Sequence, residues 1–297
     1  MTTHAVRLAA GLASKLALAV CAVLLASCGG GDDDPAPVAA PACDRACLLA
    51  QAEQLARAQA APDASARITE NGAVVAWSAA TTARLTGVAL HARAADAEHQ
   101  QAIVYGTGDD AGRPVVFSLR MARQSGKVTE TELTVAHQGE ASLFPAAVPL
   151  AEVTLLNDVV PIAQRSTAAL MIAAANAYFD GIQLADGAAV PVTDDCRRVE
   201  NGVETTNRPP NNLKCNSLGV FTYIPTVRDR RYPLIDAERG LVLGVVVFDI
   251  PGGTFNGRLY EPRSILLSEV FKVVDGKIQR IEATMRNIPL GDPTGWN

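Results

Sequence analysis

ILLSEVFKVVDGKIQRIEATM, residues 265–285, carries the clearest structural signal in this chain of 297 residues. Residues 265–274 and 278–285 are rich in apolar and β-branched side chains, and Asp275-Gly276 between them is a typical hairpin turn. The stretch therefore predicts two long antiparallel strands. Because side chains alternate between the two faces of a strand, Glu269, Phe271 and Val273 are expected to share one face.

A related pattern occurs earlier in the chain. GKVTETELT at residues 126–134 corresponds to GKIQRIEAT at 276–284, and TENG at 69–72 corresponds to VENG at 199–202. The two pairs keep the same order, and the second copy is longer by a polar insertion at about residues 201–216. We interpret the correspondence as an internal duplication.

Each copy is predicted to contain a helix followed by strands. The helices are expected over residues 47–60 and 166–184, where apolar residues recur at helical spacing. A proline-containing stretch, 144–161, separates the copies. We therefore expect a first, degenerate domain at 43–150 and a second domain at 151–297.

The amino terminus predicts export. Residues 25–28, LASC, follow a basic start and an apolar run at 16–26 that is too short to span a membrane. Small residues directly before a cysteine resemble the lipobox of bacterial lipoproteins. The resemblance implies a signal peptide at 1–27, lipidation of Cys28, and an outer-membrane lipoprotein of the cell envelope that faces the periplasm or the exterior. An ordinary signal peptide with a chance cysteine is the alternative.

The segment 28–42 is a Gly/Asp/Pro-rich tether, and four cysteines follow it. In an oxidising compartment an even number of cysteines predicts disulfides. Cys196–Cys215 would close the polar insertion, and Cys43–Cys47 would close one helical turn. Structural zinc is the rival interpretation, but the four histidines are scattered, so we expect no metal and no other cofactor.

Charge and hydropathy exclude several partners. The chain has 26 basic and 31 acidic residues and no run of lysine or arginine that would favour nucleic acid. No later apolar stretch is long enough to cross a membrane, so membrane contact is expected through the lipid anchor alone. The oligomeric state, a homodimer included, is left open.

The second copy resembles a known fold. A helix, a strand beginning at Asp194-Asp195 and long strands ending in a Gly-Lys hairpin are similar to the nuclear transport factor 2-like fold of ketosteroid isomerases and SnoaL-like cyclases. The resemblance implies an α+β class, with two tandem cones that each combine a curved antiparallel sheet with helices. Tyr178-Phe179-Asp180, Arg231-Tyr232-Pro233 and the Gly295-Trp296 ending also resemble uncharacterised secreted fungal and bacterial proteins.

The ketosteroid isomerase resemblance implies three catalytic residues. Glu200 falls at the position of the carboxylate base, while Tyr178 and Glu269 fall at the positions of the two hydrogen-bond donors to the developing oxyanion. Two of the three residues are glutamates where that family has aspartates. The residues expected to line the ligand pocket are Arg198, Phe271, Val273, Tyr223 and Tyr232.

The first copy lacks this set. It keeps Glu70, but Leu119 stands at the position of Glu269 and its helix has no tyrosine. A pocket is therefore expected in the second copy, for a small hydrophobic carbonyl compound. Two hypotheses remain for its role: an isomerase, dehydratase or lyase that works by proton transfer, or a non-catalytic ligand-binding or protein-interaction module.

Overall fold

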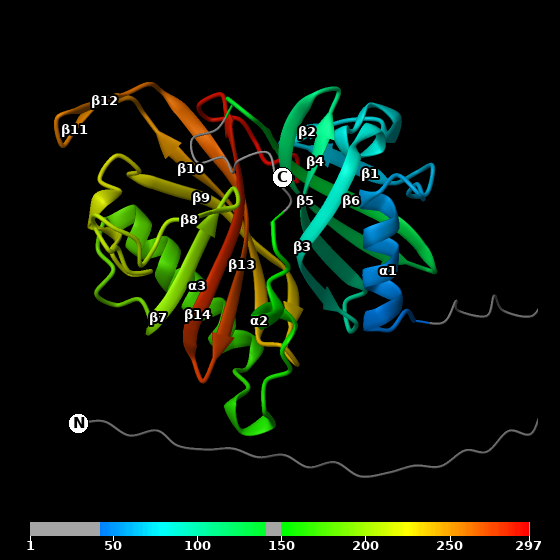
Figure 1. Ribbon diagram of the computed structural model, residues 1–297, viewed down its shortest axis with the longest axis horizontal. Coiled ribbons are helices and arrows are strands. Elements are labelled where there is room, and N and C mark those ends of the chain that lie inside the picture. Colours follow the sequence, from blue (N-terminus) through cyan, green and yellow to red (C-terminus); the bar gives the residue numbers. More distant parts are fainter. Residues whose placement is uncertain (1–41, 141–149, 297) are drawn as a thin grey trace, which may run out of the picture. The chain divides into compact units, whose positions relative to one another are not determined.

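The computed structural model describes residues 42–140 and 150–296 (Figure 1). The predicted signal peptide, Cys28 and nearly all of the tether lie outside these ranges. Within the described residues, no helix combines the length and the apolar composition needed to cross a membrane.

Among the described residues, the first half contains one α-helix, two short 3-10 helices (Trp77–Ala79 and Thr81–Arg84) and one six-stranded sheet. The helix α1 (Arg45–Ala56) is capped by Asp44, whose side chain accepts a hydrogen bond from the backbone N–H of Cys47. The strands of the sheet lie in the order β2-β1-β6-β5-β4-β3, and only the β1–β6 pair is parallel. Their bounds are β1 (Arg67–Glu70), β2 (Ala73–Val74), β3 (Thr86–Asp96), β4 (Gln101–Asp110), β5 (Arg113–Gln124) and β6 (Lys127–His137).

The second half has a second six-stranded sheet, in the order β8-β7-β14-β13-β10-β9, and a separate ribbon of β11 and β12. The helices before it are α2 (Thr154–Asn157) and α3 (Ala168–Leu184). The strands are β7 (Val192–Glu200), β8 (Val203–Glu204), β9 (Thr226–Asp236), β10 (Leu241–Ile250), β11 (Gly253–Phe255), β12 (Arg258–Tyr260), β13 (Arg263–Val274) and β14 (Lys277–Ile288).

The two sheets have the same strand order when their strands are matched in sequence. Glu70 pairs with Leu133 across the parallel β1–β6 ladder, as Glu200 pairs with Ala283 across β7–β14. On the other side of the same two residues, Leu119 of β5 pairs with Leu133, and Glu269 of β13 pairs with Ala283. The equivalences read from the two repeated strings therefore hold in the strand registers.

Two additions distinguish the second sheet. The connection between β8 and β9, residues 205–225, is longer than its counterpart at 75–85. In the chain, the β11–β12 ribbon connects β10 to β13. The equivalent strands of the first sheet, β4 and β5, are joined by a two-residue turn. Both additions lie near the cavity described below.

The predicted α+β class, with two cones of helices and sheet, is wrong. Strands account for 46% of the described residues and helices for 19%, so the protein is mostly β with two mixed sheets. The physical reason lies in how the sheet faces are covered. One long helix packs on one face of each sheet (Figure 1). Side chains of both sheets form a third core, which includes Ile103, Tyr105, Leu243 and Val270.

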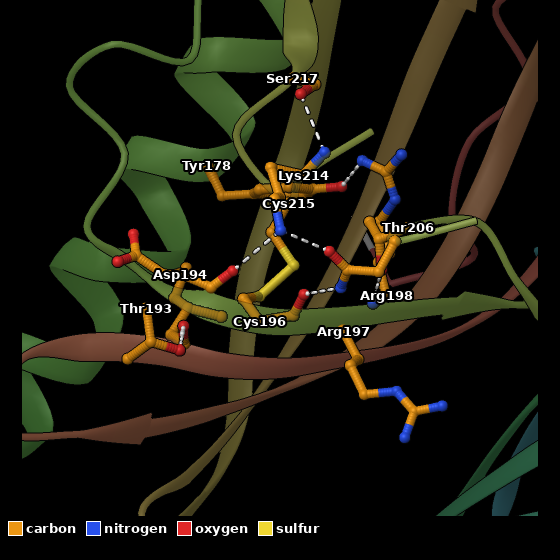
Figure 2. Close-up of a disulfide and its surroundings, with 12 residues drawn as sticks. Tyr178, Thr193, Asp194, Cys196, Arg197, Arg198, Thr206, Lys214, Cys215 and Ser217 are labelled. Carbon is orange, nitrogen blue, oxygen red and sulfur yellow. Dashed lines mark hydrogen bonds between the residues drawn. A yellow bond between two sulfur atoms is a disulfide. The ribbon is translucent and has the colours of Figure 1, made fainter. Parts of the chain in front are cut away.

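Both predicted disulfides are confirmed. The Cα atoms are 5.4 Å apart in Cys43–Cys47 and 5.9 Å apart in Cys196–Cys215, within the range that a disulfide spans. Figure 2 shows the second bond, which attaches the 205–225 connection to β7. Lys214 in the same connection donates hydrogen bonds to the backbone oxygen of Asp194 and to the side chain of Asn207.

Candidate functional site

The three residues predicted to be catalytic line one cavity of about 80 Å³ in the second half. Tyr178 comes from α3, Glu200 from the end of β7 and Glu269 from the middle of β13. The other side chains around the cavity are mostly apolar: Ile182, Phe221, Tyr223, Ile224, Phe248, Arg263, Ile265, Leu267 and Met285. Their catalytic roles stay predictions, but the structure brings the three residues together.

The cavity is smaller than the expected ligand site. Pockets for drug-sized ligands usually enclose about 300–1,000 Å³. A volume of 80 Å³ has room for about three water-sized groups. The site as it stands therefore suits a ligand of only a few heavy atoms.

A tight turn positions Glu200. Asn201 and Gly202, which join β7 to β8, both have positive φ angles, as an Asn-Gly hairpin turn requires. The side chain of Asn201 also bonds both backbone groups of Met285 in β14. The end of β7 is thereby attached to the neighbouring strand, which holds the Glu200 backbone at the cavity.

Arg198 connects the tyrosine and the predicted base. The residue is 1% exposed, and its Nη1 donates a hydrogen bond of 3.1 Å to the hydroxyl oxygen of Tyr178 (Figure 2). Its Nε donates to Thr205 over 3.0 Å and lies 3.6 Å from Oε1 of Glu200. Burial alone would lower the pKa of Arg198, but Tyr178 and Glu200 together raise it above its usual value. Arg198 therefore remains charged.

Glu269 is buried without a hydrogen-bond partner for its Oε2. It is 1% exposed, and desolvation by burial raises its pKa to about 8, with repulsion from Glu200 adding to the rise and Arg198 opposing it. At neutral pH this carboxyl group is mainly protonated. It is therefore able to donate a hydrogen bond into the cavity.

Tyr178 has the same donor character. Burial raises its pKa above the usual value, and Arg198 acts in the opposite direction. The hydroxyl group therefore keeps its proton. Its ring is held edge-on against Phe179 and Phe271, at centroid distances of 5.9 and 5.4 Å.

The predicted lining residues have different positions. Tyr223 lines the cavity, and Arg198 lies beside it against Tyr178 and Glu200. Phe271 and Val273 are fully buried in the core between α3 and the sheet and do not line it. Tyr232 does not line it either, and its hydroxyl group donates a hydrogen bond of 2.6 Å to Asn176.

Several lining residues were not predicted. Arg263, Ile265 and Leu267 share the strand parity of Glu269, so the same alternation that selected Phe271 and Val273 would have found them. Phe221 and Ile224 lie in the irregular 205–225 connection, where no periodic signal exists. Tyr223 in that connection stacks on Tyr260 of β12, with ring centroids 4.2 Å apart. Both additions to the second sheet therefore meet beside the cavity.

The equivalent position in the first half has no such site. Glu70 accepts two hydrogen bonds from Thr81, each 2.7 Å long, one from the backbone and one from the hydroxyl group. Leu119 is fully buried in the core beneath α1. The carboxylate is thus bonded to its own half, and the second acid is replaced by an apolar side chain.

Comparison with known proteins gives a family match over part of the chain and no activity. Residues 164–285, less than half of the chain, match a family described as a domain of unknown function (DUF8021). The matched region runs from before α3 to near the end of β14 and includes Tyr178, Glu200 and Glu269. No curated protein matches the chain at a significant level. Within the described residues, no group of three or more His, Cys, Asp or Glu side chains is placed to hold a metal ion.

Proposed function

We propose that the protein binds a small carbonyl compound in this cavity and transfers a proton at the carbon next to the carbonyl group. The observation that carries the proposal is the buried Glu269 carboxyl, whose Oε2 has no partner and which lines the same cavity as Tyr178 and Glu200. An unpaired buried polar group is costly to maintain. A ligand oxygen that accepts its hydrogen bond would remove that cost.

The chemistry needs a base and two donors. The Glu200 carboxylate takes a proton from the α-carbon, so that a C–H bond breaks and an O–H bond forms. The electron pair moves to the carbonyl oxygen, where Tyr178 and protonated Glu269 donate hydrogen bonds to the negative charge. Return of the proton to the same carbon gives exchange, and its return to another carbon gives an isomer. Loss of a leaving group from the neighbouring carbon gives a lyase or dehydratase.

Hydrogen–deuterium exchange tests this proposal. In D₂O, the full-length protein should replace the methyl hydrogens of pyruvate or acetone with deuterium. The loss of the methyl signal is followed by proton NMR. Glu200→Gln should abolish the exchange because it removes the base. Tyr178→Phe and Glu269→Leu each remove a hydrogen-bond donor and should each slow it about 100-fold, as loss of one oxyanion donor does in other enzymes.

Glu70→Gln is the matched control, because Glu70 holds the equivalent register position in the first sheet and lines no part of this cavity. Its exchange rate should equal that of the unmodified protein. Exchange that survives Glu200→Gln, or no exchange with either compound, contradicts the catalytic proposal.

A non-catalytic ligand-binding or interaction module is the second candidate. It is favoured by the ion pair between Glu200 and Arg198, since a carboxylate held by a guanidinium is less free to turn toward the hydrogen of a substrate. Saturable binding of pyruvate or acetone without any exchange would support this candidate over the first.

We further propose that the protein is an exported lipoprotein attached to the outer membrane through Cys28. The LASC sequence supports the proposal, and two disulfides are typical of an oxidising compartment. Cys28→Ser should release the protein from the membrane fraction, whereas Cys21→Ser, inside the signal peptide, should not. Retention of the Cys28 variant with an unmodified amino terminus by mass spectrometry contradicts the proposal.

A further inference from the structure

The cavity has a buried end and a side that borders on solvent. Tyr178, Glu200 and Glu269, the residues of the proposed chemistry, are at most 9% exposed. Phe221 and Tyr223 line the same cavity but are partly exposed. A side chain that touches both the cavity and the solvent forms part of the wall between them. Two aromatic residues of the connection between β8 and β9 therefore separate the cavity from the surrounding water.

Tyr223 is attached to the β11–β12 ribbon. Its ring stacks on that of Tyr260 in β12, with centroids 4.2 Å apart and ring planes inclined by 13°. Phe255 of β11 packs edge-on against the same Tyr260, at a centroid distance of 6.1 Å. Asn256, in the turn of the ribbon, donates a hydrogen bond of 3.0 Å to the hydroxyl oxygen of Thr222. The ribbon thus holds both Tyr223 and the residue before it.

The rest of the cavity wall has little room to move. Ile224, Phe248 and Leu267 are buried in the core of the second half, and protein cores are close-packed. Tyr223 instead belongs to an irregular connection and is held by a stacked ring and a neighbouring hydrogen bond. The volume of about 80 Å³ is therefore easiest to change at Tyr223.

From this arrangement we infer that Tyr223 is a specificity-determining residue that sets the upper size of the ligand, and that Tyr260 is the positioning residue that holds it in the wall. The inference rests on the proposed function for the nature of the ligand, a small carbonyl compound, and adds what limits its size. A close-fitting pocket can separate ligands that differ by one methylene about 10- to 200-fold. Truncation of Tyr223 would join the cavity to the space that its ring now fills.

Two ketones of different size test the inference. Acetone and cyclohexanone both carry hydrogens on the carbon next to the carbonyl group, and they differ in bulk. Binding of each to the full-length protein is measured by NMR titration. Tyr223→Ala should raise the affinity for cyclohexanone at least about tenfold relative to that for acetone, because the larger ring then fits without displacing core side chains.

Substitution of Tyr260 gives the second arm of the test. Tyr260 lines no part of the cavity, so Tyr260→Ala can change the cavity only through Tyr223 and its neighbours. It should shift the affinity ratio in the same direction by about two- to tenfold, the worth of one aromatic pair. Tyr260→Phe keeps a stacked ring and should restore the ratio of the unmodified protein.

Leu259→Ala is the matched control in the ribbon. Leu259 precedes Tyr260 in β12, is 69% exposed and lines no part of the cavity. Its removal leaves the stack of Tyr223 on Tyr260 in place. The variant should bind both ketones as the unmodified protein does.

Each outcome decides the inference. An affinity ratio that is the same in Tyr223→Ala and in the unmodified protein would overturn it, as would the absence of binding of both ketones to every variant. Equal shifts from Tyr260→Phe and Tyr260→Ala would show that the stack does not hold Tyr223. If Tyr223→Ala does not fold, the comparison of Tyr260→Ala with Tyr260→Phe decides.

Deuterium exchange separates this inference from the proposed function. A ratio that shifts in Tyr223→Ala while no variant exchanges either ketone would defeat only the proposed catalysis. Exchange of acetone that is lost in Glu200→Gln, together with an unchanged ratio in Tyr223→Ala, would defeat only the role of Tyr223.

Discussion

Arg198 donates a hydrogen bond to the hydroxyl oxygen of Tyr178, and the same guanidinium lies within ion-pair distance of Glu200. Because the tyrosine oxygen accepts this bond, its own hydrogen is left for another acceptor. One buried side chain thus orients both the proposed donor and the proposed base. We regard Arg198 as a positioning residue, since its two partners, Tyr178 and Glu200, line the cavity and Arg198 does not.

Arg198→Leu should lower the free energy of unfolding by about 3 kcal/mol, because it leaves Glu200 and the Tyr178 oxygen without their buried partner. Arg197 is the matched control. Its side chain is 57% exposed and pairs with Glu204, so Arg197→Leu should cost less than about 1 kcal/mol. Urea denaturation of both variants checks this prediction. Equal losses would show that Arg198 is not the structural link between Tyr178 and Glu200.

The titration of Glu269 should appear in the pH dependence of stability. Its pKa is about 8 in the folded protein and 4.5 when unperturbed, so between these values the native state holds a proton that the unfolded chain has lost. The contribution of Glu269 to stability is therefore complete below about pH 4.5 and is lost as the pH rises through 8. The loss is at most about 1.4 kcal/mol per pH unit.

Glu269→Gln should flatten this decline, because the amide cannot ionise, and the variant should be more stable than the unmodified protein above pH 8. Chemical denaturation over the pH range checks the prediction. Glu261→Gln is the control, since Glu261 is exposed two residues before β13. Its stability should change with pH in parallel with the unmodified protein. A parallel curve for Glu269→Gln as well would contradict the buried titration.

Local patterns in the sequence predicted the elements that carry the site. The hairpin at 265–285 forms as β13 and β14 with its turn at 275–276, and alternation places Glu269 on the cavity side. The helix expected at 166–184 forms at Ala168–Leu184 and brings Tyr178 to the cavity. Short-range periodicity is a direct consequence of backbone geometry, so these features are readable from the chain alone.

Long-range packing could not be read in the same way. Tyr105 and Val270 meet in a core between sheets although they are far apart in the chain, and no local pattern signals that one sheet covers the other. This contact is why the predicted class was wrong. Phe221 reaches the cavity from an irregular connection, so its place depends on the Cys196–Cys215 bond and on tertiary contacts rather than on periodicity.

The two disulfides should differ in their effect on stability. Cys196 and Cys215 are 19 positions apart, whereas Cys43 and Cys47 are four apart. In the chain-entropy model, loss of the longer loop costs about 3 kcal/mol and loss of the shorter about 2 kcal/mol. Double Cys→Ser variants compared by urea denaturation check the order. A larger loss from the Cys43/Cys47 variant would contradict it.

Trp296 provides a further test, of how the two sheets are joined. Its ring lies 5.2 Å from the guanidinium carbon of Arg67, 5.1 Å from that of Arg120 and 5.7 Å from that of Arg231. Its Nε1 donates to Thr69 over 3.1 Å. Arg67, Thr69 and Arg120 belong to the first sheet and Arg231 to the second, so Trp296 contacts residues of both sheets.

Trp296→Ala should lower the free energy of unfolding by about 2 kcal/mol, since it removes buried ring area and three cation–π contacts. Trp296→Phe keeps an aromatic ring but loses the hydrogen bond to Thr69, so its cost should be about 1 kcal/mol. Both variants are compared by urea denaturation, with the midpoint followed by circular dichroism because the tryptophan signal itself changes. If the alanine variant is as stable as the unmodified protein, Trp296 does not join the two sheets energetically. If phenylalanine costs as much as alanine, the hydrogen bond rather than the stacked arginines carries the effect.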